Sequence, residues 1–174
     1  LEHDRLTSLI NSMADAVLAV DRFTNVVIYN GAAMNILDLN TQLEGKPLYH
    51  LMTLVDSNNQ LVDVLSLVRG TKTVVTSEAY RLRYPDNSTI NIFLSISPVV
   101  QGFGANQSNG HVIVLRDITR QKSLEEERDE FISVVSHELR TPITIAEGNI
   151  SNARFIIDKS GDIDQIKKAL GDAH

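Results

Sequence analysis

A histidine followed directly by a glutamate stands in the segment "SVVSHELRTPIT" of residues 133–144. A neutral imidazole can attack through one ring nitrogen if the other gives up its proton, and a nearby carboxylate eases that transfer. His137 is therefore a candidate nucleophile, with Glu138 as a neighbouring acid or base. Two other interpretations stay open: an ordinary exposed histidine, and a serine nucleophile at Ser133 or Ser136, although no nucleophile-elbow motif surrounds either serine.

A metal site is the third possible chemistry for this segment. A helical zinc site of the H-E-x-x-H kind needs a second histidine four residues after the first. Thr141 occupies that position. The chain contains no cysteine, which also excludes disulfides and thiolate zinc ligands. We therefore predict no metal site.

The segment lies in a long charged stretch that is predicted to be a helix. Its apolar residues recur at steps of seven, or of three and four, which predicts a seam for a partner helix. At about 100° per residue, His137 falls nearly opposite this seam and faces solvent, with Thr141 on roughly the same side. Pro142 lacks an amide hydrogen and clashes with the carbonyl of Glu138, so the helix should be weakened or bent there. The seam residues are Leu124, Phe131, Val135, Leu139, Ala146, Ile150, Ala153 and Ile157.

A second, shorter helix is predicted after residues 158–161. Asp162 is its expected N-cap, with Gln165 as the capping-box partner. Two helices joined by a short turn form an antiparallel hairpin, usually half of a dimeric four-helix bundle. With about thirteen residues the second helix rises only roughly 20 Å, so it cannot reach back to His137. We therefore expect it to be truncated, and the bundle around His137 to be incomplete in this chain.

The residues up to about 118 alternate short β-rich runs with turn residues. The order of two strands, a helical middle and three strands predicts an α+β module, with an antiparallel five-stranded sheet and helices on one face. The expected elements are a lead-in helix at 6–13, strands at 16–21 and 25–30, helices at 31–39 and 60–70, the latter ending on a glycine C-cap, and strands at 73–82, 89–100 and 111–118.

The interior of this module should be apolar without needing a ligand. His50 could be imagined as a haem ligand, but a histidine at a helix end is more often a surface or capping residue. His111 is expected to be an exposed turn residue. The expected core residues are Val17, Leu18, Val20, Ile28, Leu37, Leu65, Phe93 and Val114.

Composition excludes several partners. The chain is 43% hydrophobic and 22% charged, as soluble globular proteins are. Its net charge of −6 without a clustered basic patch argues against nucleic-acid binding. No apolar run approaches a membrane span and no secretory signal is present, so we expect a soluble, cytoplasmic segment. Whether a longer parent protein is membrane-anchored is left open.

The stretch "FISVVSHELRTPIT" of residues 131–144 closely resembles the H-box of sensor histidine kinases, in the HisKA-type dimerisation and histidine-phosphotransfer helix. The resemblance implies that His137 accepts the γ-phosphoryl group of ATP and that Glu138 assists. It further implies that Thr141 positions the water when the same helix dephosphorylates the partner response regulator. The phosphoryl group would pass from His137 to an aspartate of the regulator's receiver domain.

The first part of the chain resembles a PAS domain. Residues 14–37, "ADAVLAVDRFTNVVIYNGAAMNIL", look like its first hairpin and helix, and residues 112–122, "VIVLRDITRQK", look like its last strand and exit. Asp117, Ile118 and Thr119 match the D-I-T signature at which PAS sensors join their output helix. The resemblance implies a PAS sensor domain at 1–118 and a signalling helix with a HisKA domain at 119–174.

The two resemblances together imply part of a two-component histidine kinase, a phosphotransferase. The ATP-binding domain is absent, because the glycines of "GFGAN" at 102–106 lack the aspartate-led D-x-G-x-G pattern. We therefore expect no cofactor in this chain, with ATP and magnesium entering through the parent's kinase domain. The expected partners are a second copy, that kinase domain and a response regulator, while the PAS ligand is unidentified. The alternative function is a non-catalytic PAS and coiled-coil scaffold that binds a ligand or partner.

Overall fold

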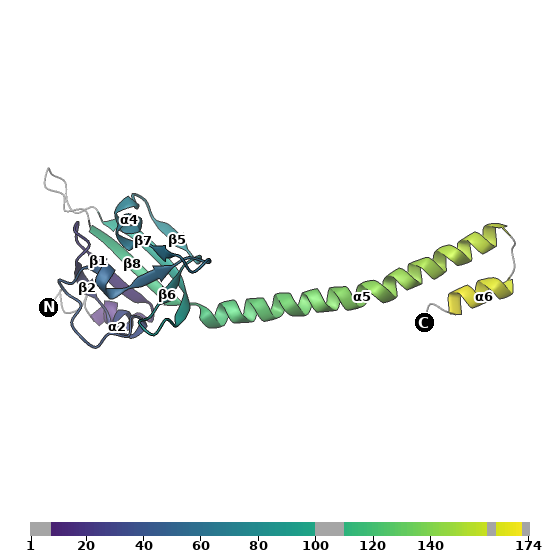
Figure 1. The fold of residues 1–174 in the computed structure, drawn as a ribbon, viewed down its shortest axis with the longest axis horizontal. Helices are drawn as coiled ribbons and strands as arrows, with labels where there is room; N and C mark the ends of the chain where they lie inside the picture. Colours follow the sequence, from purple (N-terminus) through teal and green to yellow (C-terminus); the bar gives the residue numbers. More distant parts are fainter. Residues whose placement is uncertain (1–7, 100–109, 160–162, 172–174) are drawn as a thin grey trace. The chain divides into compact units, whose positions relative to one another are not determined.

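The computed structural model describes residues 8–99, 110–159 and 163–171, which form two compact units, Leu1–Lys122 and Ser123–His174 (Figure 1). The second unit is helical and consists of most of α5 together with α6. The elements, in chain order, are β1 (Ala16–Val20), β2 (Val26–Tyr29), α2 (Gly31–Ile36), α3 (Leu48–Leu51), β3 (Thr53–Val55), β4 (Leu61–Val62), α4 (Val64–Gly70), β5 (Val75–Ser77), β6 (Arg81–Arg83), β7 (Thr89–Val99), β8 (Gly110–Asp117), α5 (Thr119–Lys159) and α6 (Ile163–Gly171).

The first unit is built on an antiparallel sheet. Five strands lie in the order β2-β1-β8-β7-β5, which confirms the predicted five-stranded α+β module. β6 pairs with β7, and two short strands that the sequence did not predict, β3 and β4, follow it and extend the sheet. The predicted lead-in helix is helical at residues 8–11.

The strand predicted at 73–82 is divided in two. β5 pairs with the middle of β7 and β6 with its beginning, and the two registers differ by one residue. Ser77 marks the break, where its hydroxyl accepts a hydrogen bond from the Ala79 amide at 3.1 Å. An extra residue of this kind bends a strand and redirects its pairing, so the prediction of one continuous strand was wrong.

The helix predicted at 60–70 is shorter than expected. Its side-chain cap is Asp63, whose carboxylate accepts hydrogen bonds from the amides of Leu65 and Ser66 at 3.1 and 3.2 Å. The residues before this cap form β4 instead, because a capped start fixes where the helix begins. The last residue of the helix is Gly70 and its C-cap is Thr71, so the predicted glycine C-cap was wrong.

The core lies on one face of the sheet. Alternate residues of β7 and β8 point into it and are 0–2% exposed, and α2, α3 and α4 supply the opposing side chains. Burial of each such aliphatic side chain contributes about 1.5–3 kcal/mol. The core residues contributed by β7 and β8 are Ile92, Leu94, Ile96, Ile113 and Leu115.

Strand alternation corrects part of the predicted core. Leu18, Val20 and Leu37 belong to the core cluster, and Val17 is buried at 9% exposure, as predicted. The other residues predicted on strands do not belong to the cluster, because successive side chains of a strand point to opposite faces and an apolar run cannot reveal which set points inward. Ile28, opposite Ala19 in the register, is 46% exposed. Leu65, Phe93 and Val114 also lie outside the core cluster and are half-buried.

Asn30 is the buried polar centre of the first unit. It is 1% exposed and caps α2. Its Oδ1 accepts hydrogen bonds from the amides of Val17 and Ala33 at 3.0 and 2.9 Å, and its Nδ2 donates to the carbonyls of Ile10 and Asp15 at 3.1 and 2.9 Å. One side chain therefore ties a helix start, a strand and the segment before that strand together.

The second unit contains a helical hairpin. α5 continues as a helix through Pro142, and its ribbon bends near its middle (Figure 1). Figure 1 shows α6 running back beside the end of α5, and Ala153 and Ala169 are buried at 3% and 7% exposure. The predicted cap Asp162 lies outside the described residues. The nine residues of α6 rise about 14 Å, whereas His137 lies about 33 Å before the end of α5, so α6 as described does not reach it.

Replacing Asn30 should destabilise the first unit strongly. Asn30→Ala leaves buried backbone groups without partners, so we expect the free energy of unfolding to fall by about 2–4 kcal/mol. Asn30→Ser can still cap α2, so its free energy of unfolding should lie between those of the wild type and of Asn30→Ala. The chain has no tryptophan and its four tyrosines all precede residue 85, so tyrosine fluorescence during urea denaturation reports on this unit. Asn35→Ala, an exposed change on α2, is the control, and an equal loss in both would contradict the assignment.

Candidate functional site

The predicted reactive residues all lie on α5 and are exposed. His137, Glu138 and Thr141 stand in unbroken helix. Thr141 is one turn after His137 and about 40° away around the axis, while Glu138 flanks His137 at about 100°. The arrangement offers an accessible imidazole with a carboxylate and a hydroxyl close by. It can accept a group from a donor presented from outside.

The backbone beside His137 is weakened. Pro142 removes the amide that would bond to the carbonyl of Glu138. Two residues later, the Thr144 hydroxyl donates to the carbonyl of Arg140 at 2.8 Å, a back-bond that often bends helices. The predicted bend therefore has two local causes, both within two turns of His137.

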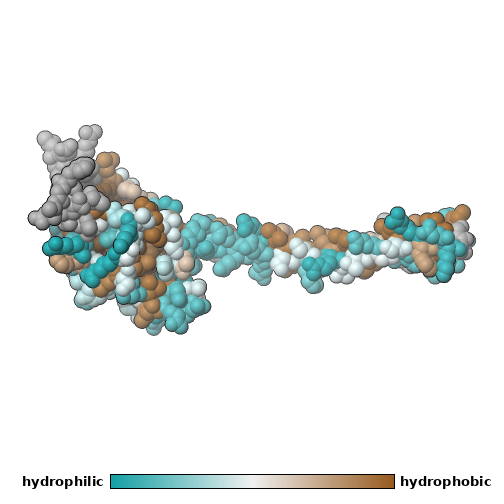
Figure 2. Space-filling view, turned by 90° about the horizontal axis from the view of Figure 1, so that it is seen from above, coloured by the Kyte–Doolittle hydropathy of each residue, from teal (hydrophilic) through white to brown (hydrophobic). Residues whose placement is uncertain are grey.

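The predicted apolar seam is present opposite His137. Figure 2 shows the beginning of α5 as hydrophilic and brown residues along its later part. Phe131 is 68% exposed and Leu139 54% exposed. A helix with this much exposed apolar surface favours a partner.

The D-I-T residues form a hydrogen-bonded joint where β8 ends and α5 begins. The Asp117 carboxylate accepts from the Thr119 amide at 2.9 Å, and the Thr119 hydroxyl accepts from the Asn91 amide at 3.0 Å. The Ile118 amide donates to the Asn91 carbonyl at 2.9 Å, and Ile118 is buried at 4% exposure. Lys122 adds an ion pair to Glu78 at 3.3 Å. The first turn of α5 is therefore fixed to β7.

Two side-chain groups near the joint have shifted pKa values. The Arg116 guanidinium, hydrogen-bonded to Asp15, lowers the pKa of that carboxyl. Burial, followed by the negative charges of Asp117 and Asp38, raises the pKa of the Tyr84 hydroxyl. Tyr84 therefore stays protonated and donates to the Ile36 carbonyl at 2.6 Å, which ties β6 to α2.

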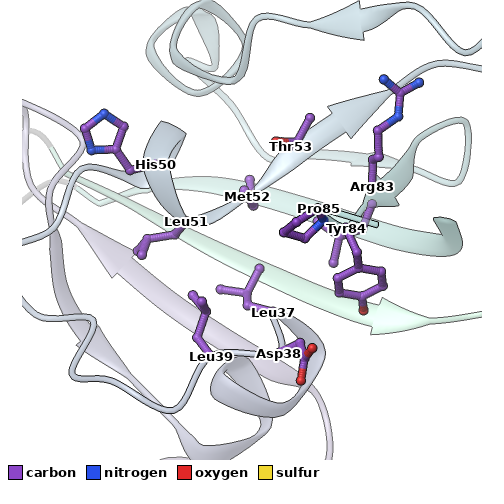
Figure 3. Close-up of a pocket in the computed structure, with 11 residues that line it drawn as sticks. Leu37, Asp38, Leu39, His50, Leu51, Met52, Thr53, Arg83, Tyr84 and Pro85 are labelled. Atoms are coloured by element: carbon purple, nitrogen blue, oxygen red, sulfur yellow. The ribbon is translucent and has the colours of Figure 1, made fainter. Parts of the chain in front are cut away.

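A small pocket of about 230 Å³ lies between the end of α2, α3 and the end of β6 (Figure 3). Its lining is mostly aliphatic, and Figure 3 shows Tyr84 and Asp38 at one side with His50 at the other. His50 is exposed in the last turn of α3, as expected for a histidine at a helix end. The volume is below the roughly 300–1,000 Å³ of typical ligand sites, so the pocket does not favour haem.

His111 differs from its prediction. It is the second residue of β8, is 9% exposed, and its Nε2 lies 3.0 Å from the carbonyl oxygen of Thr71. The prediction of an exposed turn residue was wrong because the strand begins one residue earlier and its pairing with β1 and β7 encloses the ring.

Sequence reasoning missed Asn30 and the Asp15–Arg116 pair. Asn30 could have been found, because an asparagine before a small helical run is a common N-cap. The ion pair joins residues 101 positions apart, which only the strand register brings together. Among the described residues, no group of three or more His, Asp or Glu side chains could hold a metal ion, and no helix is long and apolar enough to cross a bilayer.

Comparison with known proteins gives relatives for most of the chain. No protein-family model matches it. The sequence is 33% identical over 144 residues to the sensor protein kinase WalK of Staphylococcus haemolyticus, which covers 82% of this chain and 22% of the relative. The chain thus spans only about a fifth of the length of this curated relative.

Solved structures share the fold of the first unit. The PAS domain of nitrogen regulation protein NR(II) from Vibrio parahaemolyticus has a TM-score of 0.50 at 14% identity, covering 65% of this chain and 97% of that one. The PAS domain of BvgS from Bordetella pertussis also has a TM-score of 0.50, at 12% identity, covering 76% and 99%. The chain is therefore similar in sequence to part of a sensor protein kinase, and its first unit has the PAS fold.

Proposed function

We propose that the chain is the sensor and phosphoacceptor portion of a two-component histidine kinase, with His137 as the phosphoacceptor. The observation that supports this most is the position of His137, exposed on α5 opposite the apolar seam and beside a proline-weakened turn. A phosphoacceptor must be reached by two proteins in turn, and a solvent-facing side chain on a helix allows both approaches.

The chemistry assigned to the site is phosphoryl transfer. One imidazole nitrogen of His137 attacks the γ-phosphorus of ATP, the bond to the leaving ADP oxygen breaks, and the other ring nitrogen loses its proton, with Glu138 as the neighbouring base. ATP and magnesium enter through a kinase domain outside this chain. The phosphoryl group then passes from His137 to an aspartate of a response regulator, and Thr141 positions water when the regulator is dephosphorylated.

The two parts of the chain are assigned different roles. Residues 1–118 are proposed as the PAS sensor domain, and residues 119–174 as the signalling helix and HisKA-type dimerisation domain. The exposed seam of α5 supports a homodimer, because burying it needs a second helix along its length. In this role the segment works in the cytoplasm, where ATP and response regulators are found.

The PAS domain is proposed to act without a resident cofactor. Its interior is packed with its own side chains, since Leu18, Leu43, Leu48, Leu54 and Ile92 are all 0% exposed. A close-packed core of this kind leaves little room for a ligand between sheet and helices. The domain is then expected to modulate α5 by a change in conformation.

His137→Gln should abolish phosphorylation. When the chain is incubated with the separately produced ATP-binding domain of its parent and γ-labelled ATP, we expect acid-labile label on the wild type and background label on the variant. His50→Gln, an exposed histidine in the other unit, is the control and should label normally. Absence of label on the wild type would refute the proposal and favour a non-catalytic scaffold.

Glu138→Gln should slow labelling of His137 by about 10²-fold, the scale of a lost acid–base group. The rate constant is measured from single-turnover time courses at saturating ATP. Glu147→Gln, an exposed carboxylate two to three turns further along α5, serves as the control. Equal labelling rates in the two variants would show that Glu138 does not act as an acid or base in the reaction.

Thr141→Ala should spare phosphorylation of His137 and reduce dephosphorylation of the regulator by about tenfold or more, because a water-positioning hydroxyl is lost. Phosphorylation of His137 is measured with γ-labelled ATP and the ATP-binding domain, and dephosphorylation is measured with phosphorylated regulator. Thr144→Ala is a matched control, since its hydroxyl is bonded to the Arg140 carbonyl. Parallel loss of both activities in Thr141→Ala would contradict the role proposed for its hydroxyl.

A further inference from the structure

Asp15 and Arg116 face each other at one end of the sheet. The register of β1 and β8 pairs Ala16 with Leu115, so the next residues meet one step beyond the ladder. Arg116 donates from Nε and Nη2 to the two carboxylate oxygens of Asp15 at 2.8 and 2.6 Å. This bidentate pair joins the segment that leads into the PAS fold to the strand that leads out of it.

On one side the pair is connected to residues 8–15. Asn30 holds this segment at both ends, since its Nδ2 donates to the carbonyls of Ile10 and Asp15. The Asn11 side chain adds a bond from the Gly31 amide at 3.3 Å. The backbone carbonyls of Ile10 and Asp15 are both bonded to the Asn30 side chain. A displacement of this segment therefore also shifts Asp15.

On the other side the pair is connected to α5. Arg116 directly precedes Asp117, whose carboxylate caps the Thr119 amide. Thr119 in turn is bonded through its hydroxyl to the Asn91 amide of β7. A shift of the backbone at Arg116 therefore disturbs the hydrogen bonds that start the helix.

The exposure of the pair suits a coupling role. The side chains of Arg116 and Asp15 are 58% and 24% exposed, and ion pairs this accessible contribute little to folding. Breaking the pair should therefore leave the PAS fold intact. A weak contact with a defined geometry is the type of contact whose population a signal can shift.

We propose that the Asp15–Arg116 ion pair is a latch that couples residues 8–15 to the first turn of α5. When a change in residues 8–15 breaks the ion pair, the hydrogen bonds of the first turn of α5 weaken. The reverse also holds, because coupling between two sites is reciprocal. The latch belongs to the PAS unit alone, so it does not depend on the phosphotransfer proposed for His137.

Hydrogen–deuterium exchange of the whole chain tests the latch. In Arg116→Gln we expect amide exchange to rise about two- to fivefold both in residues 8–14 and in residues 119–123, the range that an exposed ion pair supports. Asp15→Asn should give the same result while leaving the Arg116 guanidinium over the Phe93 ring, 5.6 Å from its centroid. This separates the ion pair from the cation–π contact.

Two further variants make the test decisive. Arg128→Gln breaks a more exposed ion pair that Arg128 makes with its neighbour Asp129, and should leave both segments unchanged. The charge-swapped double variant Asp15→Arg with Arg116→Asp should restore slow exchange in both segments. The latch is refuted if only one segment responds to the single variants, or if the swap leaves exchange as fast as in them.

Discussion

Strand β8 is hydrogen-bonded on both sides, and the rest of the structure depends on this pairing. Its register with β1 and β7 runs along nearly its whole length, so its direction and the position of its last residue are fixed. The chain leaves the sheet at Asp117 and continues directly as α5. The first turn of α5 therefore starts at an end that the central strand of the sheet holds in place.

The buried polar groups make this frame specific. A sheet held only by apolar contacts can shift its register, but Asn30 satisfies all its hydrogen-bonding groups in one arrangement of β1, α2 and the preceding segment. The joint at Asp117 and Thr119 does the same for the exit of the chain. Both are made of short polar side chains that bond to backbone groups, which tolerate little displacement.

The parts of the structure that the sequence predicted well are those with a strong local period. The helical spacing around Phe131 and Leu139 located α5, and the turn residues around β1 and β2 located the first hairpin. Features set by pairing between distant residues were not predictable: the inward face of the sheet at Ile28, the burial of His111, and the meeting of Asp15 with Arg116. The β3–β4 hairpin was missed because strands of two or three residues carry almost no periodic signal. The roles of His137, Glu138 and Thr141 stay predictions, since their exposed positions are compatible with the assigned chemistry without testing it.

Pro142 has a mechanical consequence for α5. A helix with complete hydrogen bonding transmits rotation and translation along its axis as a stiff rod. The missing bond at the Glu138 carbonyl makes one turn more compliant than its neighbours. α5 therefore behaves as two rods in series, and His137 lies at the last stiff turn of the first. The turn at which α5 bends most easily therefore begins directly after His137.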